Sequence, residues 1–185
     1  PFSLIEGMTI AAYSVGANHG YIYLRSEYPL AKYFLTEAIQ TLKSSNLLGK
    51  NILGKNFAFD IELRIGAGSY VCGEETAMME SIEGKRGLVR SKPPLPAIKG
   101  LFSKPTLINN VITLASMSAI LLQGKEIFSQ FGSGKSLGTM PYQLCGNIKQ
   151  GGLIEVPFGI TLNEMIYDYG AGTLNEKPVH AVQIG

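Results

Sequence analysis

The chain has 185 residues, of which 45% are hydrophobic and 16% are charged, values typical of a globular protein with a sizeable core. Its net charge of +2 is too small to predict binding to nucleic acid or to an anionic membrane. Cys72 and Cys145 stand far apart without companion histidines or cysteines, so the sequence predicts neither a disulfide framework nor a metal site. The longest apolar run, residues 111–122, is about half a membrane span, which predicts a soluble protein with no direct membrane span.

The first third of the chain alternates between helical and strand patterns. A Ser-x-x-Glu capping box at residues 3–6 precedes apolar residues at helical spacing, which end at Gly16. The β-rich run at residues 21–25 predicts a short strand, and Pro29 marks the start of a second helix. Apolar and charged residues then alternate to the end of a strand expected over residues 57–65. This order is that of a βαβ unit in an α/β sheet.

A glycine turn follows the second strand. Gly66 and Gly68 precede a helical run that opens with Glu74 and Glu75, so the segment is predicted to be strand, glycine turn and helix. Parallel α/β sheets bind ligands at the carboxyl ends of their strands, and glycines let backbone N–H groups approach a ligand closely. A tight connection without a ligand explains the same residues, because Val71 replaces the third glycine of the dinucleotide-binding fingerprint.

The middle of the chain is predicted to be a loop followed by a helix. Residues 90–105 are expected to be a loop, in which the prolines of residues 92–96 enforce extended backbone. A long helix is expected over residues 106–123, with Asn109 and Asn110 in its first turns. Alone, these two asparagines are typical capping or solvent-facing residues. Beside a ligand-binding turn, they are suited to donate hydrogen bonds to a polar ligand.

The last third is predicted to be mostly strands. Residues 132–136 end like a phosphate-binding Walker loop, but Ser129 replaces its first glycine, so this segment is expected to be a surface loop at a domain boundary. A hairpin over residues 142–156, a helix capped by Thr161 and a final strand over residues 179–184 follow.

Four motifs together resemble a known family. They are Gly-Ala-Gly-Ser-Tyr-Val-Cys-Gly-Glu-Glu-Thr at residues 66–76, Glu-Gly-Lys-Arg-Gly at 83–87, Lys-Pro-Pro-Leu-Pro at 92–96, and Asn-Asn-Val at 109–111. The chain closely resembles, over nearly its whole length, the FMN-carrying NADH-oxidising subunit of respiratory complex I, a subunit type also found in NAD-linked hydrogenases and formate dehydrogenases. The resemblance implies a fragment: an incomplete Rossmann-like FMN-binding α/β domain over residues 1–138, then part of a β-grasp (soluble-ligand-binding, SLBB) domain over residues 139–185.

The resemblance also implies the site and its cofactors. The turn residues that bind FMN would be Gly66, Gly68, Tyr70, Gly73, Glu74 and Glu75. Of these, Gly73, Glu74 and Glu75 would border the flavin ring and the nicotinamide, with Glu75 as the candidate catalytic residue. Asn109, Asn110 and Thr113 would hold the ribityl-phosphate side of FMN. NAD(H) would be the substrate. A [4Fe–4S] cluster would belong to the parent subunit, because its four cysteines are absent from this segment, as is the upstream glycine-rich loop.

The implied activity of the parent is that of an NADH dehydrogenase (quinone) subunit, which transfers hydride from NADH to FMN and passes electrons to iron–sulfur clusters. Its implied partners are NADH, a small [2Fe–2S] subunit and a larger iron–sulfur subunit, at the cytoplasmic, inner face of the membrane; the isolated fragment is expected to be inactive. Ile112 replaces the glutamate of the family's Asn-Asn-Val-Glu-Thr, so the role of that acid does not transfer. The alternatives are a non-catalytic scaffold or subunit-docking module with a degenerate flavin domain, and a diaphorase subunit of an NAD-linked hydrogenase or formate dehydrogenase.

Overall fold

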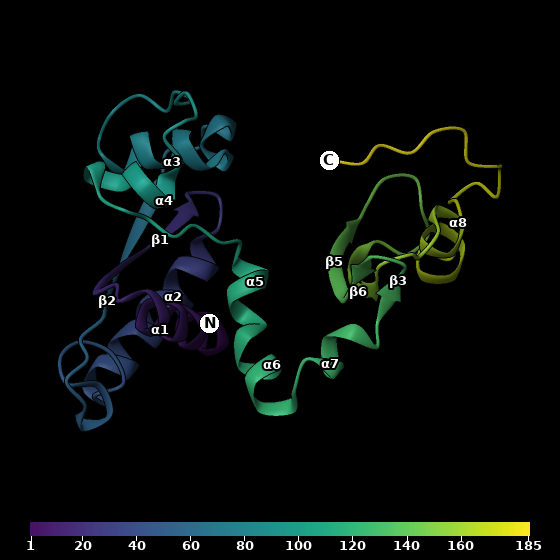
Figure 1. The fold of residues 1–185 in the computed structure, drawn as a ribbon. Coiled ribbons are helices and arrows are strands. Elements are labelled where there is room, and N and C mark those ends of the chain that lie inside the picture. Colours follow the sequence, from purple (N-terminus) through teal and green to yellow (C-terminus); the bar gives the residue numbers. More distant parts are fainter. The chain divides into compact units, whose positions relative to one another are not determined.

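The computed structural model describes residues 1–185, and the chain divides into two units (Figure 1). The first unit comprises residues 1–118, and its sheet consists of two parallel strands. The elements of this unit are α1 (Phe2–Val15), β1 (His19–Arg25), α2 (Pro29–Ser44), η1 (Ile52–Gly54), β2 (Asp60–Gly66), η2 (Tyr70–Gly73), α3 (Glu75–Ile82), α4 (Pro96–Lys99), η3 (Leu101–Ser103) and α5 (Val111–Ala115). Strand β1 pairs in parallel with β2, with His19 opposite Asp60 and Arg25 opposite Gly66. Because α2 connects the two strands, the predicted βαβ order and the α/β class are confirmed.

The sheet is covered on both faces, with α1 and α2 on one side and α3 and α4 on the other (Figure 1). On the first face, Ile22 and Ile61 are buried in a core with residues of α1 and α2. On the second face, Tyr23 Oη lies 3.0 Å from Ser81 Oγ of α3. The Tyr21 ring lies on the same side as Tyr23, and its centroid is 6.4 Å from that of Phe102. The carboxyl end of β2 therefore reaches the layer that contains α3.

The predicted loop at residues 90–105 contains two short helical turns, α4 and η3, so the prediction of a loop without helices is wrong. Pro96 occupies the first turn of α4, a position where the missing N–H of proline costs nothing. Thr106 bonds back to both helical turns and so fixes the path of the segment. Its N–H donates to the Pro96 carbonyl at 2.9 Å, and its Oγ1 accepts from Leu101 N–H at 2.9 Å. We call residues 90–103 the strap.

Two helix starts differ from prediction. The helix expected to begin at Thr106 begins at Val111, because Asn110 Oδ1 accepts a hydrogen bond from Ile112 N–H at 2.9 Å and so caps α5. Ser116 separates α5 from α6 (Met117–Gln123), so the predicted long helix is two short helices. The capping box at residues 3–6 is also wrong: α1 already begins at Phe2, and Ser3 lies inside its first turn.

Residues 119–185 form the second unit. Its elements after α6 are α7 (Glu126–Ser129), β3 (Gly132–Ser133), β4 (Ser136–Leu137), β5 (Thr139–Leu144), β6 (Gly152–Pro157), α8 (Leu162–Glu164) and the π-helical turn η4 (Met165–Tyr169). The antiparallel pairing of β5 with β6 confirms the predicted hairpin, and Thr161 caps α8 as predicted. The strand predicted over residues 179–184 is absent, since no neighbouring strand supplies backbone hydrogen bonds there. No helix has the length and apolar character required to cross a membrane.

Candidate functional site

The glycine turn begins where β2 ends, and its first two glycine positions require glycine for different physical reasons. A Cβ on Gly66 would lie 2.5 Å from Tyr23 Oη, so only glycine fits against this tyrosine without displacing it. Gly68 has a φ of 87°, a left-handed conformation that side chains disfavour. Tyr23 beneath the turn and the positive φ above it together fix the path of the chain toward η2.

The turn exposes groups that suit a flavin. The backbone N–H groups of Ala67, Gly68 and Ser69 donate no hydrogen bond within the chain, which leaves them available to acceptor oxygens of a ligand. The Tyr70 side chain is 86% exposed, and a Cβ on Gly73 would meet nothing within 4 Å. Free donors, an exposed aromatic ring and open space above a glycine are compatible with FMN, whose ring is flat and whose side chain carries oxygen acceptors.

Glu74 is the N-cap of α3 and is turned toward the helix. Its Oε2 accepts hydrogen bonds from the backbone N–H groups of Thr76 and Ala77, both at 2.8 Å, and from the Thr76 hydroxyl at 2.5 Å. The Thr76 hydroxyl is the main cause that holds the pKa of Glu74 below its usual range, and the two N–H groups and Lys92 lower it further against the effect of burial. The sequence pattern places both acids at the helix start; the structure makes Glu74 the capping residue.

Glu75, the first residue of α3, is paired with a lysine from the strap. Lys92 Nζ donates to Glu75 Oε1 and lies 3.4 Å from Glu74 Oε1. Glu75 is the larger cause that raises the pKa of Lys92, and the side chains of this lysine and both glutamates remain about a third exposed or more. The two acids at the glycine turn therefore have a shared counter-cation.

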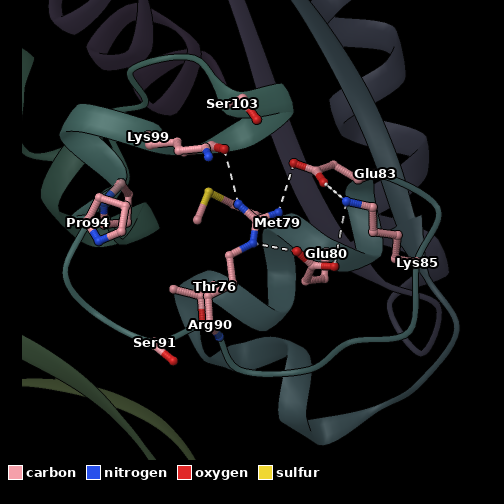
Figure 2. Close-up of a pocket in the computed structure, with 12 residues that line it drawn as sticks. Thr76, Met79, Glu80, Glu83, Lys85, Arg90, Ser91, Pro94, Lys99 and Ser103 are labelled. Atoms are coloured by element: carbon pink, nitrogen blue, oxygen red, sulfur yellow. Dashed lines mark hydrogen bonds and ion pairs between the residues drawn. The ribbon is translucent and has the colours of Figure 1, made fainter.

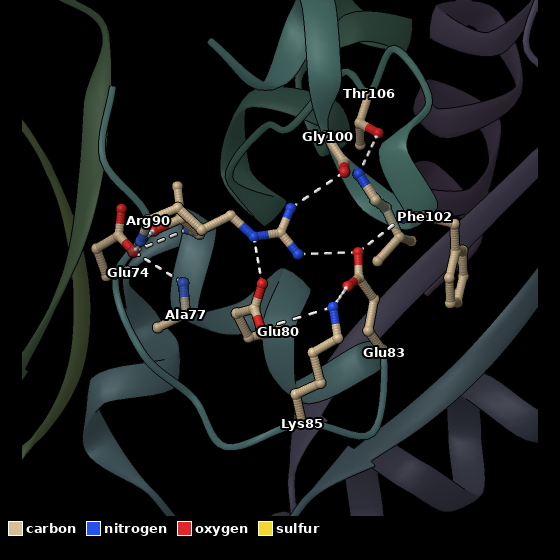
Figure 3. A network of polar contacts seen from close by, with 11 residues as sticks. Glu74, Ala77, Glu80, Glu83, Lys85, Arg90, Gly100, Phe102 and Thr106 are labelled. Atoms are coloured by element: carbon tan, nitrogen blue, oxygen red, sulfur yellow. Dashed lines mark hydrogen bonds and ion pairs between the residues drawn. The ribbon is translucent and has the colours of Figure 1, made fainter. Parts of the chain in front are cut away.

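A network of charged side chains ties the strap to α3, with Arg90 at its centre (Figure 3). Arg90 Nε donates to Glu80, its second terminal nitrogen lies 2.8 Å from Glu83 Oε1, and its first donates to the Gly100 carbonyl at 3.1 Å. Lys85 Nζ adds a second cation at 2.7 Å from Glu83 Oε2. One guanidinium thus joins two acids of the α3 region to the far part of the strap.

Glu83 is the most buried acid of this network, with 7% of its side chain exposed. Burial alone would raise its pKa, but hydrogen bonds from Lys85, Arg90 and the Phe102 N–H together lower the pKa of Glu83 to about 2. The carboxylate is therefore ionised throughout the physiological pH range, and the attraction that holds the strap does not vary with pH there.

A cavity of about 320 Å³ lies between α3 and the strap, and Figure 2 shows the Arg90 guanidinium at its wall beside Glu80 and Glu83. None of the site residues predicted from the sequence lines it. Every guanidinium nitrogen of Arg90 already has a partner in the chain. We therefore regard the wall of this cavity as the support of the strap and place the candidate site on the open side of the turn.

The structure does not join the asparagine pair to the turn directly. Asn110 caps α5, while Asn109 and Thr113 are exposed. No hydrogen bond or ion pair links these three residues to the residues between Gly66 and Glu75. The chain thus groups Gly66, Gly68, Tyr70, Gly73, Glu74 and Glu75 at one place, and presents the asparagine pair and Thr113 at the start of another helix.

Sequence reasoning missed the contacts that Lys92, Arg90 and Thr76 make at the site. The Lys92–Glu75 pair spans 17 positions, and the contact between the Arg90 N–H and Thr76 Oγ1 spans 14, so no local spacing signals either contact. The only local sign is the placement of Glu80 and Glu83 three residues apart, which puts two acids on one side of α3.

An α/β unit with an open glycine turn at the carboxyl end of a parallel strand is typical of ligand-binding α/β domains. Residues 1–119 match the protein family described as the Nuo51 FMN-binding domain, and the chain belongs to this family.

Named relatives come from two kinds of enzyme. The chain is 50% identical over its full length to the NADP-reducing hydrogenase subunit HndC of Solidesulfovibrio fructosivorans, covering 38% of that protein. It is 47% identical over its full length to an NADH-quinone oxidoreductase subunit of Aquifex aeolicus (strain VF5), covering 43% of it. The chain thus spans about two fifths of the length of these curated relatives.

A solved structure supports the same relationship. The crystal structure of an NAD⁺-reducing [NiFe]-hydrogenase in the H₂-reduced state aligns with a TM-score of 0.83 and 35% sequence identity. The alignment covers 94% of this chain and 29% of the hydrogenase chain. The resemblance deduced from the four motifs is therefore confirmed.

Proposed function

We propose that the chain is part of an NADH-oxidising flavoprotein subunit that transfers hydride from NADH to FMN and passes electrons to iron–sulfur clusters of its parent complex. The observation that carries this proposal is the glycine turn, which offers three free N–H groups beside an exposed Tyr70 and a capped helix, in a chain of the Nuo51 FMN-binding domain family. FMN, when bound, supplies the exchange between two-electron and one-electron chemistry, while the protein supplies position and electrostatics.

The proposed roles follow the placement of each residue. Gly66, Gly68 and Gly73 keep the turn free of side chains, and Tyr70 offers its ring to the ligand. Asn109, Asn110 and Thr113 bind the ribityl-phosphate side of FMN.

The two glutamates of the turn have different proposed roles. Glu74 holds the turn on α3 as its cap. Glu75 acts on the flavin and the nicotinamide through its charge, which disfavours added negative charge on the reduced ring and favours the positive charge of NAD⁺.

The proposal also concerns the domains of the chain and the partner subunits of the parent complex. We assign residues 1–138 to a Rossmann-like FMN-binding domain and residues 139–185 to a β-grasp (SLBB) domain. The partners are a small [2Fe–2S] subunit and a larger iron–sulfur subunit, at the cytoplasmic face of the membrane in a complex I-type assembly. The hydrogenase relative and the quinone oxidoreductase relative match over the whole chain with similar identity, which favours the step with a nicotinamide nucleotide over any particular terminal acceptor.

Flavin binding by the full-length subunit tests the proposal. FMN is titrated into the apo-subunit and into Asn109→Ala and Asn110→Ser variants, and binding is followed by flavin fluorescence. Serine at position 110 retains an N-cap for α5, so a tenfold or greater loss of affinity at unchanged melting temperature would place the ligand at the asparagine amide. A wild-type subunit without flavin after reconstitution would overturn the enzyme proposal and favour the scaffold alternative.

A further inference from the structure

Arg90 holds the two ends of the strap. Its guanidinium, on a side chain that is 25% exposed, bonds to Glu80 and Glu83 on one side and to the Gly100 carbonyl on the other. A planar guanidinium presents these donors in fixed directions, which a lysine ammonium does not. The contact with Gly100 crosses 10 positions of the chain, so it closes the strap into a loop against α3.

Arg90 is also connected to the acids of the glycine turn by two routes. Its backbone N–H donates to Thr76 Oγ1 at 2.9 Å, and the Thr76 hydroxyl donates to Glu74 Oε2 at 2.5 Å. Two residues further along the strap, Lys92 Nζ lies 3.4 Å from Glu74 Oε1 and donates to Glu75. The place of Lys92 therefore depends on the path that the strap takes from Arg90.

The pairs formed by Lys92 are too exposed to hold the strap by themselves. Side chains at Lys92, Glu74 and Glu75 are 36%, 34% and 39% exposed, and ion pairs of this exposure contribute little because water and salt screen them. The bonds from Arg90 reach Glu83, of which only 7% is exposed, and charge-assisted bonds in such surroundings are stronger.

We propose that Arg90 is a positioning residue, which sets the charge at the glycine turn by holding Lys92 against Glu74 and Glu75. This inference rests on the proposed function for its effect on flavin. When the strap is released, Lys92 no longer offsets the two carboxylates. Their uncompensated charge then disfavours electron uptake by a flavin bound at the turn, so its midpoint potential becomes more negative.

The test uses the full-length subunit with Arg90→Ala, Arg90→Lys and the matched control Lys85→Ala. Lys85 contacts the same two acids, at 3.9 Å from Glu80 and 2.7 Å from Glu83, but is 60% exposed and bonds to no residue of the strap. Three quantities are measured: the midpoint potential of the flavin, the pKa of Glu74 by carbon NMR, and hydrogen exchange of the Leu101 and Phe102 amides. These amides donate to Thr106 Oγ1 and Glu83 Oε1.

We expect both Arg90 variants to lower the potential, to raise the pKa of Glu74 and to accelerate exchange at Leu101 and Phe102 at least tenfold, whereas Lys85→Ala leaves all three near wild type. Arg90→Lys keeps the positive charge beside Glu80 and Glu83, so the three quantities can be measured in this variant if Arg90→Ala does not fold.

A double variant separates positioning from general loosening of the fold. If Arg90 acts through Lys92, Lys92→Met lowers the potential by a similar amount, and the double variant Arg90→Lys with Lys92→Met shows no further shift. Additive shifts, or a wild-type potential in the Arg90 variants, would overturn the proposal. If the wild-type protein binds no flavin, the proposed function fails, and the role of Arg90 is then tested in the apo-protein. A pKa of Glu74 that is the same in the Arg90 variants as in the wild type would overturn the positioning role of Arg90.

Discussion

Lys92 Nζ forms an ion pair with Glu75 Oε1 across 17 positions of the chain. The pair changes the electrostatics expected from two adjacent acids at the start of a helix. Glu74 is engaged with the helix N-terminus, whereas Glu75 extends to the strap and receives a cation there. The charge that a ligand at the turn experiences is therefore the sum over three side chains, and it changes if any one of them is replaced.

Gly73→Ala is expected to separate stability from ligand binding. A Cβ at this position meets nothing within 4 Å, so the free energy of unfolding should remain within about 0.5 kcal/mol of wild type. The same Cβ would occupy the space assigned to the flavin, so FMN affinity should fall. The matched change Gly66→Ala, whose Cβ would lie 2.5 Å from Tyr23 Oη, should cost about 1–3 kcal/mol of stability. Urea unfolding and FMN titration give the two quantities, and an unaltered affinity in Gly73→Ala would place the flavin elsewhere.

Glu74→Ala is expected to destabilise the protein by about 0.5–2 kcal/mol, because the Thr76 and Ala77 N–H groups lose their acceptor. Glu74→Asp keeps a carboxylate that is favoured at N-caps and should retain most of this stability. Thermal or urea unfolding measures both variants. Equal stability of Glu74→Ala and wild type would show that the cap does not contribute.

Glu75→Gln is expected to make the midpoint potential of bound flavin more positive, because one negative charge near the ring is removed while Lys92 remains. Spectroelectrochemical titration of the full-length subunit measures the shift. Glu37→Gln, an exposed position on α2, is the control for a general charge effect. An unchanged potential together with an unchanged preference between NADH and NAD⁺ would exclude the proposed role of Glu75.

We expect the protein to lose stability in acid because Glu83 becomes protonated there. Its pKa is about 2 in the folded protein, below the value of about 4.3 for an unfolded glutamate, so its contribution is complete above about pH 4.5. The contribution is lost as the pH falls from there toward about 2. Glu83→Gln should cost about 1.5–3 kcal/mol at neutral pH and should flatten the pH dependence in this window. Urea unfolding between pH 2 and 6 measures both, and parallel curves for the two proteins would contradict the assignment.

The sequence predicted the elements that depend on local chemistry. Helix α2 begins at Pro29, Gly16 caps the end of α1, and the glycine turn follows β2. These features depend on backbone preferences of single residues, and those preferences act wherever the residue occurs.

The errors arose where distant contacts, or the choice of cap among neighbouring residues, decide the structure. The turns of the strap depend on Thr106 and on the Arg90 network, and the start of α5 depends on which asparagine acts as the cap. The strand expected over residues 179–184 has the right alternation, but alternation forms a strand only where a neighbour pairs with it.

The candidate site could be located from sequence only in part. The motif at residues 66–76 indicated the turn and its two acids. Their counter-cation at Lys92 and its support at Arg90 could not be found in this way, because both depend on how a proline-rich segment returns to α3. The roles of the predicted site residues toward a flavin remain predictions.

The hydroxyl of Thr76 has only one orientation compatible with its two neighbours. The Arg90 N–H can only donate, so Thr76 Oγ1 must accept from it, and the hydroxyl hydrogen is directed to Glu74 Oε2. The series Arg90, Thr76, Glu74 therefore has a fixed polarity, and the hydroxyl acts as an oriented dipole instead of a free rotor. Because the backbone amide at its far end cannot receive a proton, this series does not relay protons from Glu74 to Arg90, and it links the strap to the turn by position alone.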